Sequence, residues 1–202
     1  QILKLKSIYL AAFLLFSQCS LAQNNKGRID FETYNPPSSL VVPEHVLTRA
    51  KFPFIDVHNH QGNMPTQNLK VLLSEMDKLN MKTMVNLSGR SGDFLALAVK
   101  NAKAAEPGRL IVFANPNFSG IGESDYGSKA AKQIEDDVKA GAQGLKIFKS
   151  LGFSVKDNKG ELVAVDDSRL NPIWQKCAQL GIPVLIHTAD PKQFWDEPNE
   201  QN

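Results

Sequence analysis

The feature that most constrains the fold is a regular alternation of short apolar, β-rich runs with longer amphipathic stretches. Beginning at Phe54, five such runs occur, at residues 54–58, 84–87, 110–114, 144–148 and 183–187. Successive strands joined through helices require right-handed crossovers. The alternation therefore predicts an α/β fold with a parallel sheet covered by helices.

The stretches between these runs carry apolar residues at helical spacing. Glycine and proline residues stand where the helices should begin or end: Gly141 and Gly181 suit left-handed caps, and Pro172 suits a first turn. Cys177 falls on the apolar stripe of the last helix, which favours a small buried residue over a nucleophile. A polar turn at residues 157–160 predicts a hairpin inserted after the fourth strand.

Periodicity alone does not decide between a closed barrel and an open, doubly wound sheet. Polar residues stand at the ends of several successive strands, which is where the sites of barrel enzymes are built. We therefore expect a (β/α)₈ TIM barrel. Since a barrel of about 250 residues has eight units, we expect residues 52–202 to hold the first five of them, with three more beyond Asn202.

The beginning of the chain has the composition of a secretory signal peptide. Lys4 and Lys6 precede an apolar run at residues 8–16, and small residues follow up to Ala22. We expect residues 1–22 to be removed on export to the periplasm or the medium. A lipoprotein anchored through Cys19 is less favoured, because Gln18 stands where a small residue is expected. Residues 23–51 are polar and contain prolines, which predicts an N-terminal arm.

Composition excludes several classes of partner. With 23 basic and 21 acidic residues, the net charge of +2 offers no broad surface for nucleic acid. The apolar run in the leader is too short for a permanent membrane span, which needs about 20 residues. Only Cys177 would remain after cleavage, so we expect no internal disulfide. A small molecule is the expected partner, and a homo-oligomer remains open.

The residues that carry chemistry are histidines at strand ends. His58 and His60 are two residues apart on the first strand, so their side chains should point the same way. Paired imidazoles suit Zn²⁺, and Asp56 could orient them. Taken alone, the pair could be incidental on a solvated strand end. His187 ends the fifth strand in the same manner, and three histidines at one rim favour a metal site.

These residues resemble the amidohydrolase superfamily, and in particular its amidohydrolase-related (amidohydrolase 2) branch, which includes decarboxylases and lactonases. The resemblance runs from about Pro53 to the end of the chain and is carried by residues 56–60, 144–147 and 184–187. It implies a TIM barrel in which His58, His60 and His187 bind Zn²⁺, with Mn²⁺ as an alternative. In binuclear members a strand-four lysine is carbamylated and bridges two metals. That role would fall to Lys146, for which an ordinary charged strand end is the other interpretation.

The implied activity is hydrolysis, in which a metal-activated water attacks the carbonyl of a small amide, ester or lactone. A metal-dependent decarboxylase of the same family is an alternative, and an exported solute-binding protein is an alternative from another class. The family's acid–base aspartate is expected beyond Asn202, so the chain as given is expected to be inactive.

Four further residues near the strand ends are candidates for substrate binding. Arg90 follows the second strand and could clamp a carboxylate with two hydrogen bonds. An exposed loop arginine is the alternative. Asn115 ends the third strand, Lys149 follows the fourth, and Asp190 follows His187.

Overall fold

A computed structural model describes residues 34–37, 39–40, 42–43 and 45–188. The chain divides into two units, residues 1–44 with 192–202, and residues 45–191. The described residues of the first unit form no helix or strand. The predicted signal peptide, Cys19 and Asp190 lie outside the described residues. Within the described ranges, no helix is both long and apolar enough to span a bilayer.

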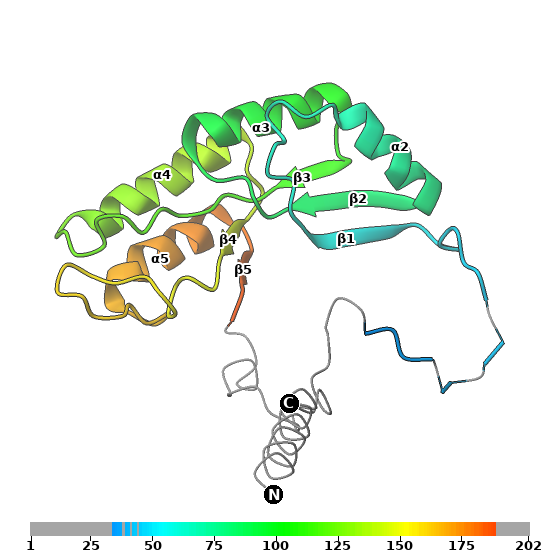
Figure 1. Cartoon of the computed structure of the whole chain (residues 1–202). Coiled ribbons are helices and arrows are strands. Elements are labelled where there is room, and N and C mark those ends of the chain that lie inside the picture. Colours follow the sequence, from blue (N-terminus) through cyan, green and yellow to red (C-terminus); the bar gives the residue numbers. More distant parts are fainter. Residues whose placement is uncertain (1–33, 38, 41, 44, 189–202) are drawn as a thin grey trace, which may run out of the picture. The chain divides into compact units, whose positions relative to one another are not determined.

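The second unit alternates strands and helices in the predicted order (Figure 1). The strands are β1 (Phe54–Asn59), β2 (Met81–Asn86), β3 (Leu110–Val112), β4 (Leu145–Ile147) and β5 (Val184–Ile186). The helices are α2 (Leu69–Leu79), α3 (Gly92–Ala105), α4 (Tyr126–Ala140) and α5 (Asn171–Leu180), and the short 3₁₀ helix η1 (Ser168–Leu170) precedes α5. All five predicted strands and the four helices between them are thereby confirmed. The strand β2 begins before its predicted start at residue 84.

All strand pairs in the two sheets are parallel. The strands β1, β2 and β3 form one sheet, and β4 pairs with β5 in a second. Ala114 links the two sheets, because its amide donates to the Gly144 carbonyl and its carbonyl accepts from the Lys146 amide, both at 2.8 Å. The spatial order of the strands is thus their order in the sequence. A doubly wound sheet would reverse its order at a switch point, and none occurs among these five strands.

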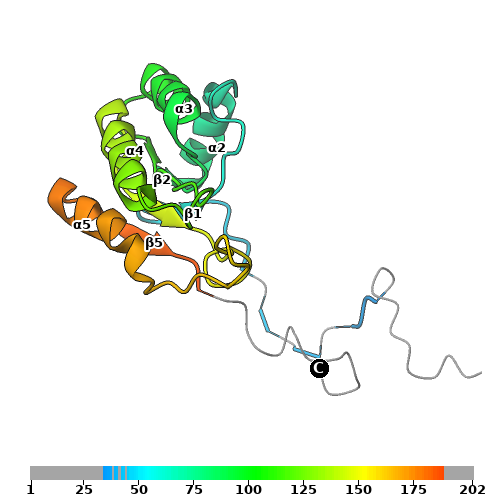
Figure 2. The same ribbon diagram turned by 90° about the vertical axis from the view of Figure 1, so that its left-hand side faces the viewer.

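The four helices lie on the same side of the strands (Figures 1 and 2). Consecutive helices pack against each other, α2 on α3, α3 on α4 and α4 on α5. Between helices and strands lies the main apolar core, which includes Leu95, Ile134, Leu145 and Ile173. A smaller cluster of Val85, Leu87 and Phe113 alternates with core residues along β2 and the end of β3, so it occupies the opposite face of the sheet.

Of the predicted barrel, the alternating strands and helices and the parallel sheets are present. The sheet does not close into a barrel within the described part of the chain. Both outer strands keep apolar side chains in water: Ile55 and Val57 on β1 are 56% and 60% exposed, and Ile186 on β5 is 39% exposed. The inner strands β2 and β4, which have neighbours on both sides, are largely buried. The exposure of β1 and β5 follows from their position at the edges of the sheet.

The helix ends and turns agree with most of the sequence predictions. Gly141 and Gly181 end α4 and α5 with φ of 118° and 66°, and Pro172 lies in the first turn of α5. The predicted hairpin is reduced to one antiparallel pair, Lys156 with Leu162. Cys177 is buried, which raises the pKa of its thiol to about 11. Its assignment as a small core residue is confirmed.

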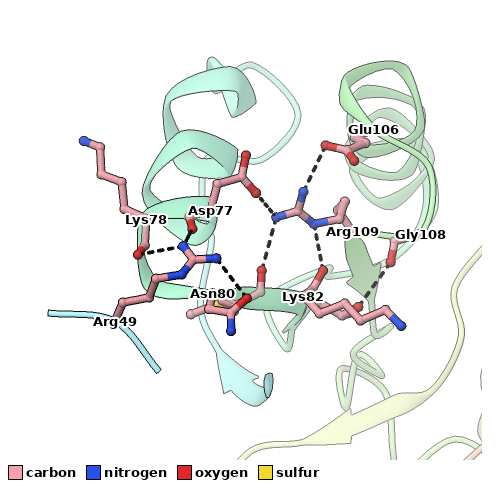
Figure 3. Close-up of polar contacts among 10 residues, drawn as sticks. Arg49, Asp77, Lys78, Asn80, Lys82, Glu106, Gly108 and Arg109 are labelled. Carbon is pink, nitrogen blue, oxygen red and sulfur yellow. Dashed lines mark hydrogen bonds and ion pairs between the residues drawn. The ribbon is translucent and has the colours of Figure 1, made fainter. Parts of the chain in front are cut away.

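Two arginines, Arg49 before β1 and Arg109 directly before β3, fasten the chain to the end of α2 (Figure 3). Arg49 donates to the carbonyls of Asp77 and Lys78 in the last turn of α2, and to the side chain of Asn80 that caps it. Cations in this position also interact favourably with the helix dipole. Arg109 donates to the Asp77 carboxylate at 2.7 Å. The last residues of the predicted arm thus belong to the second unit.

Candidate functional site

His58 and His60 lie side by side at the carboxyl end of β1. Their ring centroids are 5.3 Å apart, and the rings meet edge to face. The prediction that the two side chains come together is confirmed. Two imidazoles on one tetrahedral Zn²⁺, with Zn–N distances of about 2.0–2.1 Å, would have centroids roughly 5 Å apart. The observed spacing is compatible with a shared ion.

Electrostatic effects connect His60 with the ends of β4 and β5. The pKa of His60 is lowered, first because burial removes water and then because of the positive charges of His58, Lys146 and His187. The charges of Lys146 on β4 and of His187 after β5 thus act on the His60 ring, although His60 itself is exposed. A lowered pKa also keeps the imidazole neutral, which is the form that binds metals.

Lys146, on β4, is a buried amine. Its side chain is fully inaccessible to water, and its Nζ has no hydrogen-bond partner within the described residues. Burial lowers the pKa of this amine, and the Phe148 ring centroid lies 5.7 Å away. Lys146 is therefore not a solvated residue at the end of a strand. Burying an unpaired amine costs free energy, and such groups concentrate at functional sites.

Phe148, just past β4, contacts the His60 ring at the end of β1. The two ring centroids are 5.9 Å apart and the planes differ by 30°. The strands β1 and β4 are three strand spacings apart, so on a flat sheet such residues would be separated by roughly 14 Å. The contact therefore requires a curved sheet whose concave face carries both rings.

Polar residues at the end of β2 hold His60 in place. The Nδ1 atom of His60 lies 2.8 Å from the Ser88 hydroxyl. Asn86, which is fully buried, accepts hydrogen bonds from the amides of Gln61 and Ser88 and donates to the Gln61 carbonyl. We did not identify Asn86 or Ser88 from the sequence. The signal that could have found them is an amide side chain at the end of an apolar strand.

Asp56 contacts the chain segment that carries the two histidines. Its carboxylate accepts hydrogen bonds from the backbone amide of His58, at 3.0 Å, and from the Asn59 side chain, at 2.8 Å. These bonds reach the backbone and a neighbouring side chain rather than an imidazole ring. Asp56 thus stabilises the backbone that carries the imidazoles.

The predicted substrate residues occupy different environments. Asn115 accepts from the Arg90 amide and donates to the carbonyls of Leu87 and Lys146, so its amide ties neighbouring strand ends together. Arg90 has a left-handed backbone, with φ of 56°, and its guanidinium lies 4.4 Å from the Phe94 ring centroid. Lys149 is exposed. For Arg90 and Lys149, contact with a substrate remains a prediction.

The described ligands do not by themselves form a closed metal cage. Among the residues that the structure describes, no three His, Cys, Asp or Glu side chains converge closely enough to hold one ion. A cavity of about 230 Å³ lies along α4, where Asn117, Tyr126 and Asp137 help to line it, and no histidine lines it. The chemistry of the candidate site therefore rests on imidazoles and one amine. Imidazole nitrogens are among the ligands that Zn²⁺ prefers.

Comparison with known proteins adds no assignment, since the sequence matches no family model and no curated protein.

Proposed function

We propose that the protein is an exported, metal-dependent hydrolase similar to the amidohydrolases, and that His58, His60 and His187 bind one divalent cation. The observation that carries the proposal is the pairing of the His58 and His60 rings at the carboxyl end of β1, with Lys146 and His187 at β4 and β5 of the same parallel arrangement. Zn²⁺ is the first choice because imidazole nitrogen is among its preferred ligands, with Mn²⁺ as the alternative.

The donor set supports this choice of ion. The lowered pKa of His60 favours the neutral ring that a metal requires. Lys146 offers a buried nitrogen with no hydrogen-bond partner in the described part of the chain. Once carbamylated it would be an oxygen ligand, as in the binuclear members of the family that the sequence resembles.

The proposal includes a (β/α)₈ barrel for the complete domain. Two features support it: the strands follow one another in sequence order with all helices on one side, and the His60–Phe148 contact requires a curved sheet. In such barrels the carboxyl ends of the strands form the active-site face. The exposed apolar edges of β1 and β5 are where further strands would pair.

A bound cation would supply Lewis acidity and would lower the pKa of a water molecule to about 7, for attack on the carbonyl of a small amide, ester or lactone. The chain's own residues prepare the site for this chemistry. Ser88 holds the His60 ring, and Phe148 places an apolar wall beside it. An apolar wall limits water and strengthens electrostatic interactions near the ion.

Metal analysis of the purified chain tests the proposal. Under metal-replete conditions we expect about one tightly bound Zn²⁺ or Mn²⁺ per chain, and loss of that metal in the double variant His58→Ala/His60→Ala. His45→Ala is the matched control, because His45 is exposed and lies before β1. Wild-type protein without stoichiometric metal, or a double variant that retains it, would refute the assignment.

A related decarboxylase is a second candidate, favoured by the exposed guanidinium of Arg90 after β2. Such a cation suits a carboxylated substrate. Release of carbon dioxide from acidic substrates, with no hydrolysis of matched amides or esters, would favour this candidate. If the protein were instead a solute-binding module, His58→Ala/His60→Ala would leave ligand affinity unchanged.

A further inference from the structure

We propose that Ser88, held in position by Asn86, is a positioning residue that sets the tautomer and orientation of His60. In this arrangement Nδ1 carries the proton and donates it to the Ser88 hydroxyl, which leaves the lone pair on Nε2 to bind a cation. The inference rests on the proposed function for its metal. In the metal-free protein, the same hydrogen bond should keep the His60 proton on Nδ1.

The hydrogen bond itself is the first observation. His60 Nδ1 and Ser88 Oγ are 2.8 Å apart and come from the ends of neighbouring strands. A neutral imidazole has one protonated nitrogen and one lone pair, so a bond that uses Nδ1 as donor assigns the lone pair to Nε2. The ring of His58, by contrast, makes no hydrogen bond to another described residue. Only one of the two adjacent imidazoles is therefore oriented in this way.

Asn86 fixes the backbone that carries the Ser88 hydroxyl. Its Oδ1 accepts from the Ser88 amide at 3.0 Å and from the Gln61 amide at 2.9 Å, while its Nδ2 donates to the Gln61 carbonyl at 3.2 Å. One buried side chain thus holds both the residue that carries the hydroxyl and the residue that follows His60. Because Asn86 itself is fully buried, losing these bonds would leave its amide unpaired away from water, which is costly, so the end of β2 and the segment after His60 stay aligned.

The backbone after Ser88 restricts it further. A Cβ atom at Gly89 would lie 2.2 Å from the Phe113 carbonyl oxygen, so the chain passes β3 at a distance that only glycine permits. Ser88 is therefore held on one side by Asn86 and on the other by this close approach. Partners of metal-binding histidines typically contribute 10–100-fold to metal affinity.

Zn²⁺ affinity of the full chain, measured by competition with a chromophoric chelator, provides the first test. Ser88→Ala should weaken Zn²⁺ binding by about 10–100-fold, whereas Ser88→Thr, which keeps the hydroxyl, should stay within a few-fold of wild type. Ser74→Ala is the matched control, because Ser74 is exposed on α2. Equal affinity of wild type and Ser88→Ala would overturn the inference.

The second test uses metal-free protein and does not depend on the proposed function. Long-range ¹H–¹⁵N correlation spectra should show His60 protonated at Nδ1 in wild type and in Ser88→Thr. In Ser88→Ala and Ser88→Cys we expect the ring to move toward the Nε2-protonated tautomer. A ring protonated at Nε2 in wild type, or an Nδ1 proton that persists without the hydroxyl, would overturn the inference. Failure of wild type to bind Zn²⁺ would instead refute the proposed function.

Discussion

Gly89→Ala is a direct test of the packing between β2 and β3 beside the candidate site. The new Cβ would lie 2.2 Å from the Phe113 carbonyl oxygen and 2.6 Å from Val112 Cγ1, against the 3.4–4 Å of ordinary contact. The oxygen would have to retreat by more than about 1 Å. Because it is a backbone atom, no rotamer change relieves the clash. Overpacking of this kind costs about 1–3 kcal/mol, and we expect the upper end of that range.

Urea unfolding of the metal-free chain measures this effect. Gly89→Ala should lower the transition midpoint at an unchanged slope, corresponding to a loss of about 2–3 kcal/mol in the free energy of unfolding. Gly62→Ala is the matched control: Gly62 follows His60 closely, and its added Cβ would meet nothing within 4 Å. The control should stay within about 0.5 kcal/mol of wild type. Equal unfolding midpoints for the two variants would refute the argument.

Three further predictions concern other buried or paired groups. Lys146→Met should raise the free energy of unfolding of the metal-free protein at pH 7, because it removes an unpaired buried amine. Burial lowers the pKa of Lys146 in the folded chain, so between the two pKa values the unfolded chain binds a proton that the folded chain does not. The gain in the free energy of unfolding should therefore shrink as pH rises toward 10.5. Urea unfolding at pH 7 and pH 9 tests both points. Arg109→Met should lower the free energy of unfolding by about 1–3 kcal/mol, because the carbonyls of Met81 and Lys82 lose a charged donor (Figure 3). Lys132→Ala breaks only an exposed ion pair and should lower it by less than about 0.5 kcal/mol. Thermal unfolding of the two variants distinguishes these effects. Cys177, with a pKa of about 11, should resist a thiol-specific chromogenic reagent at pH 8 until denaturant is added, and rapid labelling of the native chain would contradict its burial.

Hydrophobic periodicity was enough to locate the strands and helices of the second unit. Period-two and helical patterns reflect which side of a local element faces the core, and this depends on neighbours in the sequence. The same local rule brought His58 and His60 together, since both side chains leave one strand. Caps such as Gly141 were equally predictable, because a left-handed residue is a local requirement.

Tertiary structure decided the rest. The sequential strand order depends on the Ala114 bridge between two sheets, and the burial of Lys146 depends on how those sheets curve. The bond from His60 to Ser88 joins residues 28 positions apart, and nothing in either residue's local pattern specifies the other. A local pattern determines the face of a strand on which a side chain lies. Which side chain of another strand it meets depends on how the whole sheet assembles and bends.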